Sequence, residues 1–206
     1  LHLDHCTDRN VLRDCLEAGW SSVLFDCSGI TLDDATEQTK QVVAEARVFG
    51  AHVEGEIEGI KGVEDGVGSD EDSQLYALED AVHFVRQTGI HCFAPAIGNA
   101  HGAYPQLPEL DVARVDALVS ATGLPMALHG GSGLSDDQFR DLIGRGCVKV
   151  NISTALKHAY IDAHREFLTV NPGCREPLTL MASVSDSVSQ VAQSLIKVFG
   201  SEGSVA

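Results

Sequence analysis

The chain alternates between short apolar runs and longer amphipathic stretches. Six runs rich in apolar and β-branched residues have the length of buried strands, and they cover residues 1–4, 22–26, 52–58, 92–98, 125–129 and 147–152. Apolar residues spaced three and four apart predict helices over residues 8–18, 32–49, 78–88, 111–122, 135–144 and 154–169. A last helix is predicted over residues 182–199, after a break at residues 172–177 that begins and ends with proline.

Regular alternation of strand and helix favours a parallel sheet, because parallel neighbours need crossover connections and helices provide them. Six βα units can be counted, and no linker or low-complexity segment divides them. At 206 residues the chain is long enough to bury one sizeable core. The sequence therefore predicts an α/β fold in a single domain over residues 1–206.

One connection, at residues 59–77, is longer than the others. It is acidic, and four glycines are spaced through its first half, at positions 59, 62, 66 and 68. Long loops in compact domains are often active-site lids, and glycines provide their hinges. We predict a mobile lid here that could carry a catalytic carboxylate. A solvated acidic loop is the alternative.

Composition and charge restrict the class and the partners. The chain has 44% hydrophobic and 21% charged residues, which is typical of a soluble globular protein. Its net charge of −16 disfavours nucleic acid and anionic membranes as partners. The longest apolar runs are too short to cross a bilayer, and no secretory signal opens the chain. Six cysteines without a C-x-x-C pair favour reduced thiols and a cytoplasmic location.

Three apolar stretches end in a histidine: His5, His101 and His129. Parallel α/β folds place their chemistry where the carboxyl ends of the strands meet, so we expect these side chains at one rim. Three imidazoles can bind zinc and leave a fourth position free for substrate. Asp4, beside the first histidine, is the candidate acid or base. A single histidine at a strand end is more often structural, so the prediction depends on all three.

Five motifs carry a resemblance to a known family. They are "HLDH", "GEIEGIKGVEDG", "AIGNAHG", "LHGGSG" and "KVNISTALK", and they extend over nearly the whole chain. In order and spacing they resemble the class II, zinc-dependent ketose-bisphosphate aldolases of the tagatose-bisphosphate and fructose-bisphosphate type. No single motif is specific, but the ordered set is.

The resemblance implies a (β/α)₈ TIM barrel of which about six of the eight βα units are present. "HLDH" resembles the third strand of that barrel, so the two N-terminal units are missing. A TIM barrel typically needs about 250 residues, and 206 residues fall short by about two units. We expect a fragment of a longer chain; a natural truncation is the alternative.

The resemblance also implies roles for the site residues. His5, His101 and His129 would bind one catalytic Zn²⁺. Asp4 matches the residue that protonates the aldehyde oxygen during bond formation, although orienting His5 is an alternative role. Glu64, in the predicted lid, matches the residue that abstracts a proton from the substrate.

Two further carboxylates, Asp26 and Glu56, end their strands and resemble acidic residues near the metal, either beside its ligands or at a second ion. Each could also be a buried structural carboxylate. The resemblance leaves room for a monovalent cation.

Phosphate binding is expected from backbone groups and hydroxyls that follow two of the strands. Barrels often hold phosphate between the loops after strands 7 and 8, and the runs "HGGSG" and "NIST" occupy those positions. The predicted substrate-binding residues are Gly102, Gly130, Gly131, Ser132, Asn151, Ser153 and Thr154. Glycine-rich turns alone are weak evidence, but these adjoin the predicted ligands.

The predicted activity is that of a carbon–carbon lyase of carbohydrate metabolism, for instance in glycolysis. It would cleave or form a ketose 1,6-bisphosphate through the enediolate of dihydroxyacetone phosphate. Its partners would be phosphorylated ketoses, triose phosphates and other copies of the chain, in a dimer or tetramer. Two alternatives stay open: an impaired fragment that binds zinc or sugar phosphate without turnover, and a zinc hydrolase on a barrel. Glu58 and Lys61 stand where glycines are usual in the family, and Gly29 stands where a histidine is common.

Overall fold

The computed structural model describes residues 1–64, 67–69, 75–102 and 106–204. Six parallel strands form one curved sheet in the order β1-β2-β3-β6-β7-β8. Their bounds are β1 (His2–Cys6), β2 (Ser22–Asp26), β3 (His52–Glu56), β6 (Cys92–Phe93), β7 (Met126–Leu128) and β8 (Cys147–Val150). The α/β class and the partial barrel are thereby confirmed.

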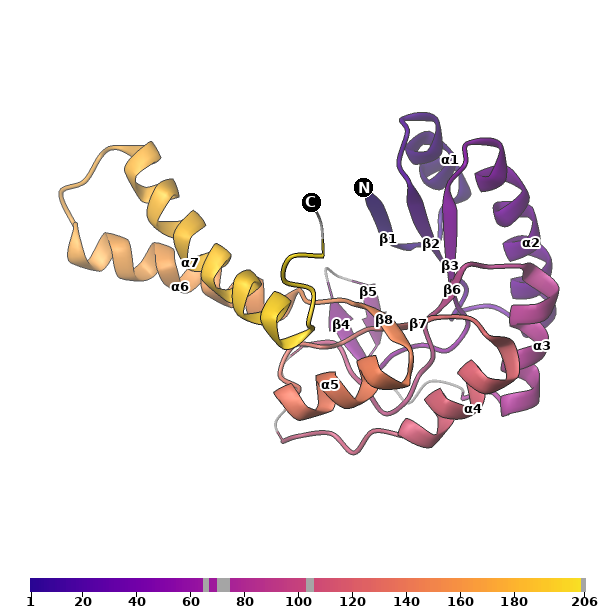
Figure 1. The fold of residues 1–206 in the computed structure, drawn as a ribbon. Helices are drawn as coiled ribbons and strands as arrows, with labels where there is room; N and C mark the ends of the chain where they lie inside the picture. Colours follow the sequence, from indigo (N-terminus) through magenta and orange to yellow (C-terminus); the bar gives the residue numbers. More distant parts are fainter. Residues whose placement is uncertain (65–66, 70–74, 103–105, 205–206) are drawn as a thin grey trace.

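Five helices cover the outside of the sheet, as the arc in Figure 1 shows. They are α1 (Arg9–Glu17), α2 (Leu32–Val48), α3 (Leu78–Thr88), α4 (Val112–Thr122) and α5 (Asp136–Arg145). Leu16, Phe84 and Leu142 are buried on their inner faces, where they belong to the same core as Phe25 and Phe93 of the sheet. Burial of these apolar faces is the main force that holds helices to sheet.

Two long helices follow the last strand: α6 (Thr154–Val170) and α7 (Pro177–Val198). They pack against one another and extend away from the sheet (Figure 1). The predicted start of the last helix, at residue 182, was wrong. Helix α7 begins at Pro177, because proline at the first helical position lacks only an N–H that would have no partner there.

Two predicted strands end earlier than expected. The run 92–98 pairs only over Cys92–Phe93, since Pro95 has no N–H to donate to a neighbouring strand. The run 52–58 ends as a strand at Glu56. Residues 59–77 also differ from a structureless loop, because they contain an antiparallel pair, β4 (Gly62–Glu64) and β5 (Val67–Ser69).

The helices in the described part of the chain include none with the combined length and apolar character of a membrane span.

Candidate metal centre

The structure brings His5, His101 and His129 together from three separate segments. His5 lies within β1, His129 directly follows β7, and His101 lies in the connection after β6. The ring centroids of His5 lie 5.1 Å from His101 and 4.7 Å from His129. One nitrogen of each ring lies within 4.8 Å of the other two. His101 therefore reaches the cluster from a loop, and not from a strand end as its sequence pattern suggested.

The geometry of two of these rings fits a zinc ion. Nδ1 of His129 and Nε2 of His5 lie 3.0 Å apart. Tetrahedral zinc with Zn–N bonds of about 2.0–2.1 Å needs ligand nitrogens roughly 3.3 Å apart, so little movement would be required.

The nitrogens on the far sides of these rings face carboxylates. Nε2 of His129 lies 2.7 Å from Glu54 Oε1, and Nδ1 of His5 lies 3.2 Å from Asp26 Oδ2. In the tautomers in which each carboxylate accepts a hydrogen bond from the ring N–H beside it, the opposite nitrogen keeps a lone pair for a metal. Burial also lowers the pKa of His129, which keeps the ring neutral, although Glu54 opposes this effect.

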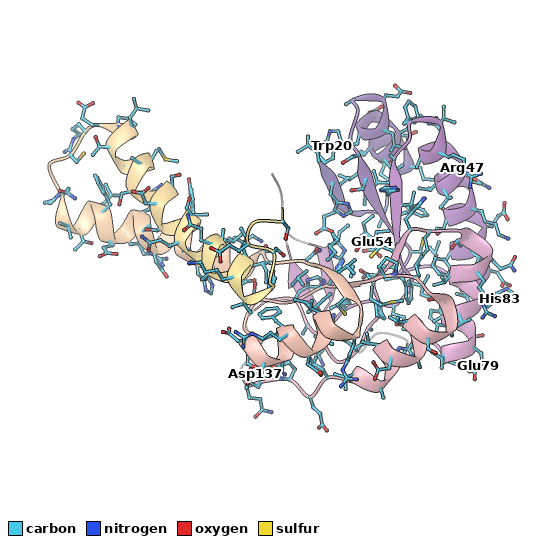
Figure 2. All side chains as sticks on the ribbon, viewed as in Figure 1. Trp20, Arg47, Glu54, Glu79, His83 and Asp137 are labelled. Atoms are coloured by element: carbon cyan, nitrogen blue, oxygen red, sulfur yellow. The ribbon has the colours of Figure 1, made fainter. Side chains whose placement is uncertain are left out.

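Glu54 is a functional candidate that the sequence analysis missed. It is buried on β3, and Lys149 Nζ lies 2.9 Å from its Oε2. Figure 2 shows Glu54 among the strands, whereas Arg47, Glu79 and Asp137 project from the outer helices. Burial alone would raise the pKa of Glu54, but His129 and Lys149 outweigh it and the net shift is downward. The sequence contained a signal for Glu54. Side chains alternate along a strand, so Glu54 points to the same face of the sheet as Glu56, which was selected.

Asp26 and Glu56 are direct neighbours on β2 and β3, and with His5 they form a second group able to hold an ion. Asp26 accepts hydrogen bonds from the N–H and hydroxyl of Ser28; together with the His5 bond these outweigh burial and lower its pKa. Glu56 is buried, and within the described residues its Oε2 makes no hydrogen bond, although Nδ1 of His129 lies 3.4 Å away. Burial, together with the nearby Asp26 charge, raises its pKa well above the usual value. A cation here would offset that cost.

The backbone conformation restricts the positions of two of the rings, those of His5 and His101. His5 has φ of +44°, a left-handed conformation that is rare outside glycine, and the register of β1 against β2 shifts between Leu3 and Cys6. The N–H of His101 donates to the carbonyl of Lys61 at 2.7 Å. Gly62 lies so close to this contact that an added Cβ would be 2.4 Å from the His101 carbonyl oxygen. Strained or close-packed backbone of this kind is characteristic of functional sites.

Asp4 lies at the edge of the cluster with its carboxylate partly exposed. Nδ2 of Asn151 donates to both oxygens, at 3.0 and 2.9 Å, and Lys149 Nζ lies 3.7 Å from Oδ1. Burial pulls the pKa of Asp4 upward, but contacts with His2 and Lys149 outweigh it and hold the pKa well below its usual range. The side chain is therefore an ionised proton acceptor at neutral pH.

The predicted phosphate-binding residues gather near the start of α6. The Ser132 hydroxyl accepts from the N–H of Ala155 at 3.2 Å, and the N–H of Gly131 donates to the carbonyl of Asn151 at 3.2 Å. Ser153 and Thr154 begin the helix, and the side chain of Ser153 does not cap it. Backbone N–H groups at a helix N-terminus can bind an anion. The remaining two, Gly102 and Gly130, follow the histidines directly, both with positive φ.

The prediction for Glu64 is only partly covered. Glu64 is the last residue of β4, and its side chain lies outside the described part of the structure. Its role stays a prediction.

The chain is similar to known proteins over nearly its whole length. The family model described as fructose-bisphosphate aldolase class-II matches residues 1–204. The D-tagatose-1,6-bisphosphate aldolase subunit GatY of Klebsiella oxytoca is 35% identical over 204 residues, which are 98% of this chain and 72% of that protein. The sulfofructosephosphate aldolase of Alkalicoccus urumqiensis is 34% identical over 98% of this chain and 71% of its own. The crystal structure of the YdjI aldolase from Escherichia coli K12 is 28% identical, with a TM-score of 0.80, over 100% of this chain and 70% of its own.

Proposed function

Because the chain belongs to the class II fructose-bisphosphate aldolase family, whose named members are carbon–carbon lyases, we propose that it acts through a catalytic zinc ion. The proposed substrate is a ketose 1,6-bisphosphate of the tagatose or fructose type, cleaved to or formed from dihydroxyacetone phosphate and an aldehyde. One observation carries the proposal: three imidazoles converge, and two of them are oriented by buried carboxylates.

The residues present fit zinc, because His5, His101 and His129 supply three imidazole nitrogens. Zinc held there would supply Lewis-acid polarisation of the substrate carbonyl. In the cleavage direction Asp4, which is ionised at neutral pH, would accept the proton of the hydroxyl next to the bond that breaks. In the reverse direction the same group would return that proton to the aldehyde oxygen.

Four further roles belong to the proposal. Glu64 would add and remove the proton at the reacting carbon of dihydroxyacetone phosphate. The 59–77 lid would bring Glu64 to that carbon. The start of α6, with Ser132 and Gly131 beside it, would hold a phosphate. Asp26 and Glu56 would support His5, and a monovalent cation would bind nearby.

The proposal is tested by assaying cleavage of fructose and tagatose 1,6-bisphosphates through the dihydroxyacetone phosphate released. Removing metal with EDTA is expected to reduce the rate at least about a hundredfold, and one equivalent of Zn²⁺ is expected to restore it. Full activity after chelation, or a lysine adduct trapped by borohydride, would contradict the zinc mechanism. Stoichiometric zinc binding without cleavage would support the alternative of an impaired binding protein.

A cytoplasmic place in carbohydrate metabolism is part of the proposal. It is supported by the six cysteines, which are all free thiols. Burial raises the pKa of Cys27 to about 12, and that of Cys147 likewise, so these thiols are unreactive packing residues.

Helices α6 and α7 support self-association. Only Ala163 of α6 and Val184 of α7 are buried, although the two helices contain 17 and 22 residues. Tyr160 and Ile161 are more than 40% exposed, and they line an apolar hollow together with Val188. An apolar surface of this kind usually marks a protein interface, so we propose that two copies meet here.

Ile161→Glu is expected to weaken this association by about a hundredfold in dissociation constant, because a charge would replace a central apolar anchor. Light scattering coupled to gel filtration measures the result. The matched control is Val48→Glu, on the outer surface of α2, where Val48 is 80% exposed. A wild-type protein that is monomeric at high micromolar concentration, or an Ile161→Glu variant with unchanged mass, would rule out this interface.

A further inference from the structure

Glu58 follows β3, and its side chain is completely buried. Its Oε1 accepts hydrogen bonds from the backbone N–H of Tyr76 at 3.0 Å and from Arg114 Nη2 at 2.5 Å. Its Oε2 accepts from the backbone N–H of Ala96 at 2.9 Å. The same Arg114 nitrogen donates to the carbonyl of Tyr76 at 3.1 Å. One ion pair thus joins the end of β3, the start of α3, the loop after β6 and helix α4.

The burial of this pair calls for an explanation beyond stability. Burial raises the pKa of Glu58, although Arg114 and the two N–H groups oppose that shift. A buried ion pair often adds no stability over apolar residues of the same size, because both charges lose their hydration. Its fixed hydrogen-bond directions, in contrast, specify how the joined segments lie.

One path leads from Glu58 through Ala96 into the loop that carries His101. Within this loop the N–H of Ile97 donates to Asn99 Oδ1 at 2.8 Å. Nδ2 of Asn99 then donates to the carbonyl of His129 at 2.9 Å. The loop is therefore held to Glu58 at one end and to a predicted metal ligand further on.

A second path leads from Glu58 along the chain to Lys61. The carbonyl of Lys61 accepts from the N–H of His101 at 2.7 Å, and Lys61 forms a parallel bridge with Ala100. Both segments that leave Glu58 therefore meet again at His101. A shift of Glu58 would therefore be transmitted to His101 through both segments.

We propose that Glu58 and Arg114 are positioning residues, which hold the loop 94–101 and the start of the 59–77 segment so that His101 faces the metal. The inference rests on the proposed function only in taking His101 as a ligand. Neither Glu58 nor Arg114 is assigned a contact with substrate.

The first test needs no metal and no activity. Amide hydrogen exchange of the metal-free protein is compared for the wild type, Glu58→Gln, Arg114→Met and Arg114→Lys. Peptide 94–101 is expected to exchange at least about tenfold faster in Glu58→Gln and in Arg114→Met than in the wild type. In Arg114→Lys, which keeps the charge, the acceleration is expected to stay within about threefold. Peptide 136–145 of α5 is the internal reference and is expected to be unchanged.

The second test measures Co²⁺ binding, with the visible spectrum as the readout of ligand geometry. Glu58→Gln and Arg114→Met are expected to bind Co²⁺ about 10- to 100-fold more weakly, as when groups that orient metal ligands are lost. The double variant is expected to be no weaker than Arg114→Met, because both changes act through one contact. Glu45→Gln, which removes the Glu45 partner of Arg9 on the outer surface, is the matched control.

The outcomes separate positioning from simple stabilisation. If every peptide exchanges faster by one common factor, the pair only stabilises the fold and the proposal is wrong. It is equally wrong if peptide 94–101 exchanges as in the wild type. If Glu58→Gln does not fold, the comparison of Arg114→Met with Arg114→Lys decides the question. A wild type that binds Co²⁺ but cleaves no ketose bisphosphate would count against the proposed function and leave both tests of positioning intact.

Discussion

His101→Ala is expected to weaken zinc binding at least about a thousandfold and to abolish measurable aldol cleavage. A three-histidine site that loses one ligand keeps two, which is too few to hold zinc against water and buffer. His101 is the best of the three to replace, since Glu54 and Asp26 would be left facing cavities if His129 or His5 were removed. Competition with a chromophoric chelator measures the affinity, and circular dichroism checks the fold.

The matched control is His83→Ala, on the outer surface of α3, where Figure 2 shows the side chain projecting away from the sheet. It is expected to bind zinc like the wild type. A His101→Ala protein that retains one equivalent of tightly bound zinc would exclude His101 from the ligand set. The second group, with Asp26 and Glu56, would then become the better candidate for the metal.

Asp4→Asn is expected to reduce kcat by about 10²- to 10⁴-fold while zinc stoichiometry stays at one. Asparagine preserves the shape and still accepts a hydrogen bond from Asn151, but it cannot take up a proton. The measurements are steady-state kinetics and metal content on the same preparation, with Asp33→Asn on the surface of α2 as the control.

The pH profile adds a check on Asp4. Because the folded pKa of Asp4 lies below its usual value, its carboxylate stays ionised throughout pH 5–8 and should produce no inflection there. Its contribution to stability is present above the unfolded pKa of about 3.9 and is lost as the pH falls toward the folded pKa. If Asp4→Asn loses zinc along with activity, the residue orients His5 and does not transfer protons.

The sequence predicted the sheet well, because strand and helix periods differ and each βα unit repeats the same contrast. It failed where a local feature overrode the period. Pro95 shortened β6, and Pro177 began a helix that was expected to start five residues later. The pairing of β4 with β5 was missed because glycine-rich acidic segments carry no alternating apolar pattern.

The candidate site divides in the same way. The three histidines could be chosen because each ends an apolar run, and the fold brings them together, His5 and His129 from strands and His101 from the loop after β6. Glu54 could not be ranked above Glu56, since a sequence does not state which carboxylate meets a ring nitrogen. The contact of Asn151 with Asp4 joins residues 147 positions apart, so only the curvature of the sheet, which brings the end of β8 near β1, creates it.

The bond between the His101 N–H and the Lys61 carbonyl has a kinetic consequence. Any displacement of residue 61 that opens the way to the substrate would pull on the backbone of His101, the proposed metal ligand. The rates of substrate entry and of metal dissociation would then be coupled. A change that makes this segment open faster would also make the ion dissociate faster. The dissociation rate of the metal, measured while substrate is titrated, would therefore report the position of the segment around residue 61.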